Sequence, residues 1–366
     1  MKRRTTQITA KSNITSYVEI NLTALKHNAA LLRERVPDGI KTMAVVKANA
    51  YGHGAALVAH ALSGSVTALG VASVEEAINI RNSGVILPIL VFAPPRAGNI
   101  SDYKTYNLVA TVGSFYELEL MSSSISFHIE FDTGMGRLGF SPNEWPELLQ
   151  KLNKSELKPS GVMTHFATAD APGSDKVNVQ LQLFNKLLED MGSWKQGKVI
   201  HASNSGGLLY YPEAAFSMVR FGIAVYGFSP SAVESIPGLK PVLSWKSCVS
   251  VCKPLKKGET VSYEANWSAP QDGWLVVVPV GYADGIRRGL SNKIEMSVAG
   301  KRLKQVGNIT MDYTMLYSNE PVETGEEVVI LGENAMMADE WAELLDTIPY
   351  EILCGIHPKI ERRPVS

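Results

Sequence analysis

Lys47 is the side chain whose surroundings in the sequence most favour chemistry. It follows a short apolar run, residues 43–46, whose composition predicts a buried strand. A turn rich in Gly and Asn comes next, in the segment Lys47-Ala48-Asn49-Ala50-Tyr51-Gly52-His53-Gly54. A lysine between a buried strand and such a loop has the position of a catalytic residue in a barrel. Such a lysine taken alone is more often a solvated strand-end residue, so the rest of the chain has to decide.

Polar side chains follow several later apolar runs in the same way. They are Asp132 and Arg137 after run 126–131, His165 at the end of run 160–165, His201, Asn204 and Ser205 around the end of run 198–202, and Arg220, Gly222 and Ile223 within run 218–225. The carboxyl ends of barrel strands meet at one face, where barrel enzymes have their active sites. We therefore expect these side chains to share one mouth with Lys47.

The elements that would position these residues alternate along the chain. Apolar runs predict strands at 42–46, 68–72, 88–92, 108–112, 126–131, 160–165, 198–202 and 218–225. Amphipathic stretches between them predict helices, for example at 22–34, 74–82, 144–152 and 180–191. Eight such units favour an α/β fold of the (β/α)₈ TIM-barrel type over an open sheet. The Gly-x-Gly-x-x-Gly motif of an open dinucleotide-binding sheet does not follow the first strand.

The alternation ends in segment 229–241, which contains three prolines. Beyond it, strand-like runs dominate, at 242–251, 275–279, 293–298, 314–316 and 327–331, with one helical stretch at 338–345. This pattern predicts a mostly-β C-terminal domain. We place the barrel at 14–235 and the β-rich domain at 236–366, and expect residues 1–13 to pack near the latter.

The composition argues against several classes of protein. The formal net charge of -1 gives no reason to expect nucleic acid or an anionic membrane as a partner. No apolar run has the length of a membrane span, and the N-terminal residues lack the apolar core of a secretory signal. The three cysteines, Cys248, Cys252 and Cys354, form no CxxC pair. They predict reduced thiols in a cytoplasmic protein, and no metal site is expected.

Two Gly-rich segments suggest a phosphorylated ligand. They are Asn204-Ser205-Gly206-Gly207 and Arg220-Phe221-Gly222-Ile223, next to the seventh and eighth predicted strands, where barrels commonly bind phosphate. A strand-end lysine beside a phosphate site fits pyridoxal 5'-phosphate, which a lysine can hold covalently. A barrel enzyme that acts on a sugar phosphate fits these residue types equally well.

The motifs distinguish these alternatives, because they resemble those of the alanine racemases in order along almost the whole chain. The segment from Lys47 to Gly54 resembles the pyridoxal-phosphate attachment segment of that family. The other matching blocks are Asp132-Thr133-Gly134-Met135-Gly136-Arg137-Leu138-Gly139, Thr164-His165-Phe166-Ala167, Asn204-Ser205, Arg220-Phe221-Gly222-Ile223, Tyr226-Gly227, Val261-Ser262-Tyr263, Gly281-Tyr282-Ala283-Asp284-Gly285, Met311-Asp312 and Tyr350-Glu351.

The resemblance implies two catalytic bases on opposite faces of the substrate. Lys47 would carry the cofactor and act as one base, and Tyr263 would act as the other. A tyrosine has an ordinary pKa of about 10, so a cation should lie nearby, and the family places Arg220 and His165 there. Arg220 would also face the pyridine nitrogen and leave it unprotonated, because arginine keeps its own proton.

The remaining roles also come from the resemblance. Phosphate contacts would be made by Tyr51, Ser205, Gly222, Ile223 and Tyr350, and Asn204 would belong to the cofactor site. The substrate would meet Arg137, the N–H of Met311, Tyr263 and Tyr282. Arg137 would also bond the phenolic oxygen of the cofactor, and His165 would contribute to the cofactor site. Tyr263, Tyr282 and Met311 would come from the partner chain of a head-to-tail homodimer.

Three positions depart from the family pattern. Glu130 occupies the position of a carbamylated lysine found in many members, so its carboxylate should replace the carbamate and remove any need for carbon dioxide. Asn308 stands where an arginine is common, and Pro349 where an asparagine is common. The last two alter the entrance and so bear on substrate breadth.

These features together predict a cytoplasmic alanine racemase that interconverts L- and D-alanine and supplies D-alanine for peptidoglycan. One alternative is a racemase of broader scope, for example one acting on serine. Another is a barrel that binds pyridoxal phosphate without catalysis, although the β-rich domain with Tyr263 argues against it.

Overall fold

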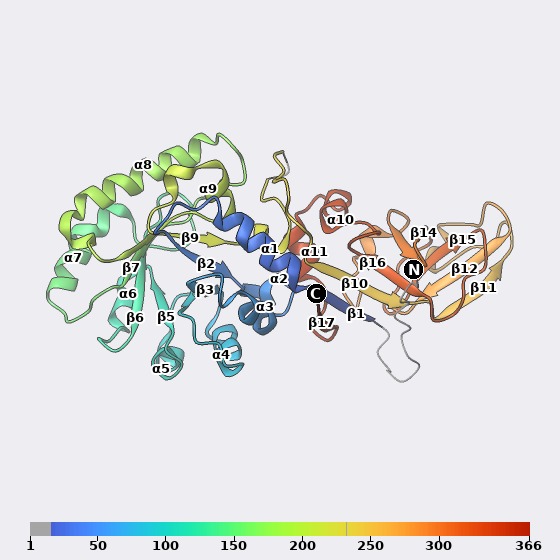
Figure 1. The fold of residues 1–366 in the computed structure, drawn as a ribbon, viewed down its shortest axis with the longest axis horizontal. Coiled ribbons are helices and arrows are strands. Elements are labelled where there is room, and N and C mark those ends of the chain that lie inside the picture. The colour runs from blue at the N-terminus through green and yellow to red at the C-terminus, as the bar shows by residue number, and fades with distance from the viewer. Residues whose placement is uncertain (1–15, 232) are drawn as a thin grey trace. The chain divides into compact units, whose positions relative to one another are not determined.

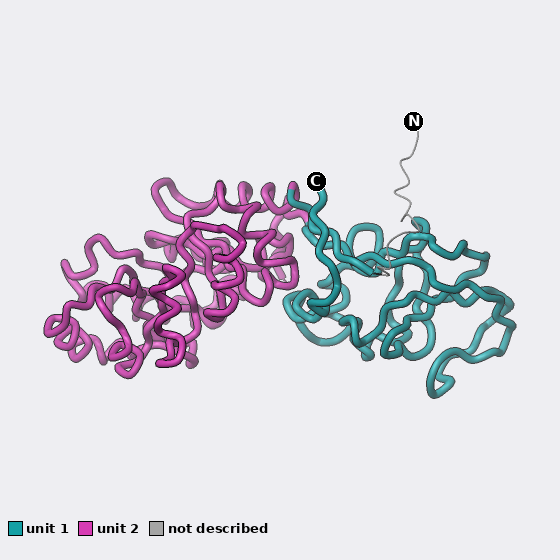
Figure 2. Tube along the Cα trace, turned by 90° about the horizontal axis from the view of Figure 1, so that it is seen from below, with its two compact units in different colours: residues 1–22, 241–366 teal, residues 23–240 magenta. Residues whose placement is uncertain are grey.

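The structure, a computed structural model, describes residues 16–231 and 233–366, which form two compact units (Figure 2). Among the described residues, unit 1 contains residues 16–22 together with Pro241–Ser366, and unit 2 lies within Thr23–Lys240. The sequence prediction placed the division at 235/236 and kept residues 14–22 with the barrel. The predicted packing of residues 1–13 lies outside the described residues.

Within residues 23–231 and 233–240, unit 2 forms a parallel sheet of eight strands. They are β2 (Lys41–Val45), β3 (Ala68–Val71), β4 (Ile89–Val91), β5 (Val109–Val112), β6 (Ser126–Glu130), β7 (Gly161–Met163), β8 (Val199–His201) and β9 (Met218–Phe221). The pairing order runs β8-β7-β6-β5-β4-β3-β2-β9. The two ends of this order are joined, because Ser217 N–H donates to Ile200 O at 2.9 Å and Arg220 N–H to Ser203 O at 3.1 Å. The predicted (β/α)₈ barrel is therefore confirmed.

Helices lie on the outside of these strands (Figure 1). They are α1 (Leu22–Arg33), α3 (Ala55–Leu62), α4 (Val74–Asn82), α5 (Ile100–Thr105), α6 (Phe115–Glu119), α7 (Trp145–Asn153), α8 (Asp175–Asp190) and α9 (Ser205–Tyr210). Helix α8 shows why they dock: Val177, Leu181, Phe184 and Leu188 recur every three or four residues and are buried. Met43, Ala68, Leu90, Met163 and Met218, from five strands of the barrel, form one buried apolar cluster. None of the helices in the described ranges has the length and apolar composition that a membrane-spanning helix needs.

In unit 1, the residues from 16 onward form a nine-stranded sheet, ordered β11-β12-β15-β14-β13-β16-β10-β1-β17. Its strands are β1 (Ser16–Asn21), β10 (Leu243–Cys248), β11 (Val251–Leu255), β12 (Gly273–Val278), β13 (Glu295–Val298), β14 (Lys301–Gln305), β15 (Thr314–Ser318), β16 (Glu327–Leu331) and β17 (Glu361–Val365). Two helices accompany them among the described residues, α10 (Ala338–Leu344) and α11 (Pro349–Cys354). The predicted mostly-β second domain is confirmed.

Several predicted boundaries are wrong. The single strand expected at 242–251 is two strands, β10 and β11. Strands β1, β14 and β17 and helix α11 were not predicted, and β1 pairs with β10 rather than joining the barrel. Strands β7 and β9 are shorter than predicted, so His165 lies beyond the end of β7.

Candidate active site

Lys47 begins a short segment, α2 (Lys47–Tyr51), whose backbone is left-handed rather than α-helical. The φ angles are +52° at Ala48, +53° at Asn49, +56° at Ala50 and +51° at Tyr51. A left-handed helical conformation costs roughly 1–2 kcal/mol for each residue that carries a Cβ. Four such residues in a row persist only where their surroundings hold them, a situation typical of functional sites.

Side chains within and just after this turn hold it in place. Asn49 Oδ1 accepts a hydrogen bond from Ala55 N–H at 2.8 Å, which ties the turn to the start of α3. His53 Nδ1 lies 2.9 Å from both Ala50 O and Tyr51 O. Because carbonyl oxygens only accept, Nδ1 of His53 carries the hydrogen.

Tyr51, Ser205 and Gly222 come together at the mouth of the barrel. A Cβ added to Gly222 would lie 3.4 Å from Ser205 Oγ and 3.6 Å from Tyr51 Oη, so the two hydroxyls and the backbone surround one small space. Gly222 N–H donates to Ser205 Oγ at 2.8 Å, which leaves the hydroxyl hydrogen of Ser205 for another acceptor. This geometry suits a phosphate group.

Asn204 and Ile223, next to this space, have different structural roles. Asn204 caps α9, with its Oδ1 accepting from Gly207 N–H at 2.9 Å, so the Asn204 side chain positions the loop of Ser205. Ile223 is buried and opens the short helical turn Ile223–Tyr226 that follows β9.

Arg220 is the buried charge of the site, with 2% of its surface exposed. Its guanidinium donates to His201 Nδ1 at 2.7 Å, His165 Nδ1 at 2.9 Å and Ala202 O at 2.7 Å. Burial is the main cause that lowers the pKa of Arg220 to about 10; the charge of Glu130 acts against this shift, and the charge of Arg137 acts with it. Arg220 therefore remains a cation at neutral pH.

The histidines around Arg220 are neutral. Burial and then the charge of Arg220 lower the pKa of His165 and of His201 well below the ordinary histidine value. The sequence-based expectation that His165 supplies a cation near Tyr263 is thus wrong, because Arg220 only donates and His165 accepts from it. Arg220 is therefore a buried cation of the barrel mouth, and His165 is its neutral acceptor.

His128 extends this chain and was missed by sequence reasoning. Its Nδ1 lies 2.9 Å from His201 Nε2. His201 accepts from Arg220 at Nδ1, so its single hydrogen is on Nε2 and is donated to His128. Gly161 makes room for the ring, since a Cβ there would lie 2.6 Å from His128 Cδ2. The available signal was the two-residue spacing from Glu130, which puts both side chains on one face of β6.

Asp132 shapes the loop that carries Arg137. One Asp132 oxygen accepts from Gly134 N–H and Met135 N–H, both at 2.8 Å, and the other from Gly136 N–H at 2.9 Å. Burial opposes ionisation, but these N–H groups lower the pKa of the carboxyl below its usual value. Arg137 follows with an exposed side chain.

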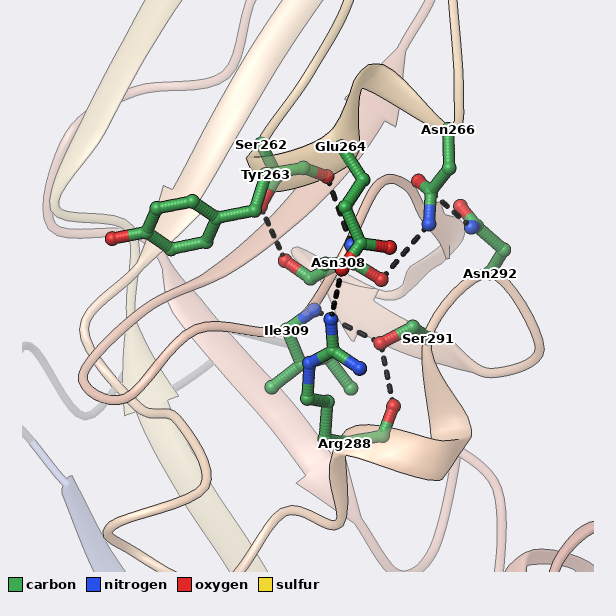
Figure 3. A network of polar contacts seen from close by, with 9 residues as sticks. All are labelled: Ser262, Tyr263, Glu264, Asn266, Arg288, Ser291, Asn292, Asn308 and Ile309. Atoms are coloured by element: carbon green, nitrogen blue, oxygen red, sulfur yellow. Dashed lines mark hydrogen bonds and ion pairs between the residues drawn. The ribbon is translucent and has the colours of Figure 1, made fainter.

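Unit 1 carries Tyr263 on a second strained segment, shown in Figure 3. The φ angles are +68° at Ser262, +68° at Glu264 and +48° at Ala265. Asn308, which is buried, donates from Nδ2 to Tyr263 O at 2.8 Å, and its own carbonyl accepts from Ser262 Oγ at 2.6 Å. Asn308 therefore forms hydrogen bonds with this segment both before and after the Tyr263 side chain.

Tyr263, Met311 and Tyr282 lie on the same part of unit 1. Tyr263 and Met311 line an open hollow of about 1200 Å³. Tyr282 is joined to the Met311 segment through Tyr282 N–H, which donates to Thr310 O at 2.9 Å. The exposed fractions of Tyr263 and Met311 are 71% and 53%. Tyr350 is in α11 of unit 1, whereas Tyr51, Ser205 and Gly222 are in unit 2.

Comparisons with known proteins agree with these two units. A family model described as alanine racemase, N-terminal domain, matches residues 20–230, and one described as alanine racemase, C-terminal domain, matches residues 242–364. An alanine racemase of Desulfosudis oleivorans is 38% identical over 377 residues, covering 96% of this chain and 97% of the relative.

Solved structures give the same result. The crystal structure of alanine racemase from Bacillus anthracis with bound L-Ala-P has a TM-score of 0.90 and 33% identity, covering 98% of this chain and 96% of that one. A histidine racemase from Leuconostoc mesenteroides has a TM-score of 0.89 and 28% identity, covering 97% and 99%. The chain therefore belongs to the alanine racemase family.

Proposed function

We propose that this protein is an alanine racemase that uses pyridoxal 5'-phosphate to interconvert L- and D-alanine. The observation that carries the proposal is the buried Arg220 cation, fixed between the neutral side chains of His165 and His201. It lies in the same barrel mouth as the space between Tyr51, Ser205 and Gly222.

The residues of the barrel mouth fit the cofactor. The hydroxyls of Tyr51 and Ser205 and the small residue Gly222 surround a space that fits its phosphate, with Asn204 and Ile223 shaping the loops on either side. Lys47 would hold the cofactor covalently. Tyr350 would complete the phosphate site from α11.

Arg220 would donate to the ring nitrogen and keep its own proton, because its pKa of about 10 exceeds neutral pH. When bound, pyridoxal phosphate supplies an electron sink that makes the α-hydrogen of an amino acid acidic. An arginine in this position limits that sink, which favours proton exchange at the α-carbon over bond-breaking side reactions.

Racemisation needs one base on each face of the substrate. We assign these roles to the Lys47 amine and the Tyr263 hydroxyl: in each direction one of them removes the α-hydrogen from its own face, and the other protonates the opposite face. Arg137 would bond the phenolic oxygen of the cofactor and the substrate carboxylate. In the described part of the chain, the N–H of Met311 has no acceptor, which suits it to the same carboxylate. Tyr282, near Met311, would narrow the entrance.

The assembly that fits these assignments is a head-to-tail homodimer with shared active sites. The 71% exposure of Tyr263 supports it, since a proton-transfer group works best where water is excluded. The three cysteines, which form no CxxC pair, support a cytoplasmic location, and D-alanine made there would serve peptidoglycan synthesis.

The test is direct. Purified protein supplied with pyridoxal phosphate should form D-alanine from L-alanine and L-alanine from D-alanine. Conversion of neither isomer would refute the activity, and would leave a racemase for another amino acid or a barrel that binds the cofactor without catalysis.

A broader racemase remains the second candidate. Asn308 and Pro349 replace an arginine and an asparagine that resemblance leads us to expect near the entrance. The structural neighbour that is a histidine racemase indicates that this fold serves other amino acids. Serine and histidine should therefore be assayed beside alanine, and a higher kcat/KM for either would displace alanine as the substrate.

A further inference from the structure

Glu76 connects the Lys47 turn to a neighbouring loop of the barrel. It lies in the first turn of α4, which Ser73 caps by accepting from Glu76 N–H at 3.3 Å. One oxygen of the Glu76 carboxylate accepts from Ala72 N–H at 2.7 Å, and the other accepts from Ala48 N–H at 2.6 Å. A single side chain thus bridges the loops that follow β2 and β3.

The bond to Ala48 matters because of which peptide it holds. The Ala48 N–H belongs to the peptide bond between Lys47 and Ala48, at the point where the left-handed segment begins. Fixing the plane of that peptide fixes the direction in which the Lys47 side chain leaves the backbone. A charged acceptor at 2.6 Å is a strong restraint of this kind.

The chain contains a matched case without this restraint. Ser114 caps α6 by accepting from Glu117 N–H at 3.3 Å, and Glu117 accepts from Gly113 N–H at 2.6 Å. The two caps therefore share the same arrangement and each needs one carboxylate oxygen. The cap of α4 needs only the Glu76 oxygen that accepts from Ala72 N–H. The bond from the second oxygen to Ala48 N–H is therefore additional to the cap.

We propose that Glu76 is a positioning residue for Lys47, holding the strained turn so that the lysine points into the barrel mouth. The proposal rests on the proposed function, in which Lys47 carries the cofactor and moves a proton. Misplacement of a catalytic group by about 1 Å can cost on the order of 100-fold in rate. The restraint is present without a bound ligand. Its loss should therefore change the exchange of the Ala48 amide as well as kcat.

The test compares Glu76→Gln with Glu117→Gln. A glutamine offers one acceptor oxygen and one NH₂ group. At position 117 that oxygen satisfies the single N–H, so we expect kcat within about twofold of the parent. At position 76 two N–H groups need acceptors, and the NH₂ would face one of them. We expect kcat to fall about 10- to 100-fold with KM for alanine little changed.

A second measurement does not depend on turnover. Hydrogen exchange of the Ala48 amide should be at least about tenfold faster in Glu76→Gln and unchanged in Glu117→Gln, because only the first loses an acceptor for that amide. Ser73→Ala is a further control, since it weakens the α4 cap and keeps the bridge. It should leave Ala48 exchange as in the parent protein.

The outcomes separate the possibilities. Equal effects of the two glutamine variants, or parental kcat and Ala48 exchange in Glu76→Gln, would show that Glu76 only caps a helix and would overturn the proposal. Faster Ala48 exchange with a selective loss of kcat supports it. If the parent protein does not racemise alanine, the proposed function fails, and faster Ala48 exchange in Glu76→Gln still supports the restraint on the Lys47 turn.

Discussion

Glu130 ends β6 as a buried carboxyl group with 6% of its surface exposed. Burial raises its pKa to about 7, although the positive charges of Arg220 and Arg137 act in the opposite direction. Within residues 16–231 and 233–366, the Glu130 carboxyl group forms no ion pair and no hydrogen bond. The carboxyl group that should replace a carbamate therefore has its pKa raised toward neutral pH.

This buried carboxyl makes stability depend on pH. The folded pKa is raised, so ionisation costs the folded state nothing below the usual value of 4.5 and progressively more as the pH rises through about 7. A shift of this size corresponds to roughly 3 kcal/mol when it is fully expressed. We expect Glu130→Gln to be more stable than the parent at pH 8, by up to that amount, and equally stable near pH 4.5. Urea unfolding at the two pH values measures the difference.

A stability change of the opposite sign would contradict this account of Glu130. If Glu130→Gln is less stable at pH 8, the two arginines stabilise the carboxylate more than burial destabilises it.

Addition of bicarbonate should leave the activity of the parent protein unchanged in either case, because Glu130 itself supplies the carboxyl group that replaces the carbamate.

Lys47 is the second residue whose role can be tested in isolation. Reduction with borohydride makes a lysine-bound pyridoxal phosphate permanent, because the cofactor is joined to the amine through a reducible bond. Peptide mapping of the reduced protein should find the cofactor on a peptide that contains Lys47. A label on another lysine, or on none, would contradict the assignment, and Lys47→Ala should give an unlabelled protein as control.

At the scale of elements, both proposed bases are carried by short segments with positive φ angles, Ala48–Tyr51 beside Lys47 and Ser262–Ala265 around Tyr263. Neither segment is held only by its own backbone. Glu76 reaches the first from α4, and Asn308 reaches the second from the loop between β14 and β15. A strained backbone segment keeps its conformation only if neighbouring elements hold it. The positions of Lys47 and Tyr263 therefore depend on these contacts.

The Asn308 contact gives a prediction for the Tyr263 segment. Asn308→Ala removes the donor to Tyr263 O and the acceptor for Asn266, which should cost about 1–3 kcal/mol of stability. If Tyr263 is one of two bases, its displacement slows proton removal from one enantiomer only. The kinetic isotope effect of α-deuterated alanine should therefore rise in one direction of racemisation and not in the other.

Asn266→Ala is the matched control for this measurement. It removes the partner of Asn308 Oδ1 but keeps the bond from Asn308 to Tyr263 O. Isotope effects that rise equally in both directions, or that rise as much in Asn266→Ala, would show that Asn308 does not act through Tyr263.

The elements also explain which parts of the fold could be predicted from the sequence. The barrel strands are apolar on both faces because helices cover them, and this gives continuous runs that are easy to find. Strands β14 (Lys-Arg-Leu-Lys-Gln) and β17 (Glu-Arg-Arg-Pro-Val) were missed because their charged residues hide any apolar run. Strand β1 was missed as part of unit 1 because its partners, β10 and β17, lie more than two hundred residues away in sequence.

The site was predictable where a residue follows a strand and not where two distant segments meet. Lys47, His165 and Arg220 stood out by position. The bond between Glu76 and Ala48 joins residues 28 apart on different loops, and a local pattern cannot indicate it. Left-handed φ angles in an Ala-Asn-Ala-Tyr sequence are equally hidden, since only Asn among these residues favours them.

For the whole molecule, the proposed bases belong to different units, Lys47 to unit 2 and Tyr263 to unit 1 (Figure 2). Tyr263 and Met311 are largely exposed along the hollow of unit 1, in a chain whose proposed chemistry requires a tyrosine next to the substrate. A second copy of the chain, related by a two-fold axis, would supply the missing surface to both sites at once.

Subunit complementation tests this shared site. Loss of a well-placed acid–base group typically costs about 10²–10⁴-fold, so Lys47→Ala and Tyr263→Phe homodimers should each be nearly inactive. When the two inactive variants are mixed under conditions that exchange subunits, about half of the dimers are mixed if pairing is random. In a mixed dimer with shared sites, one site combines both mutations and the other combines native Lys47 with native Tyr263. Roughly a quarter of the native activity should then return. If mixed dimers form, as mass spectrometry of the intact complex can establish, and no activity returns, both bases act within one chain and the sites are not shared.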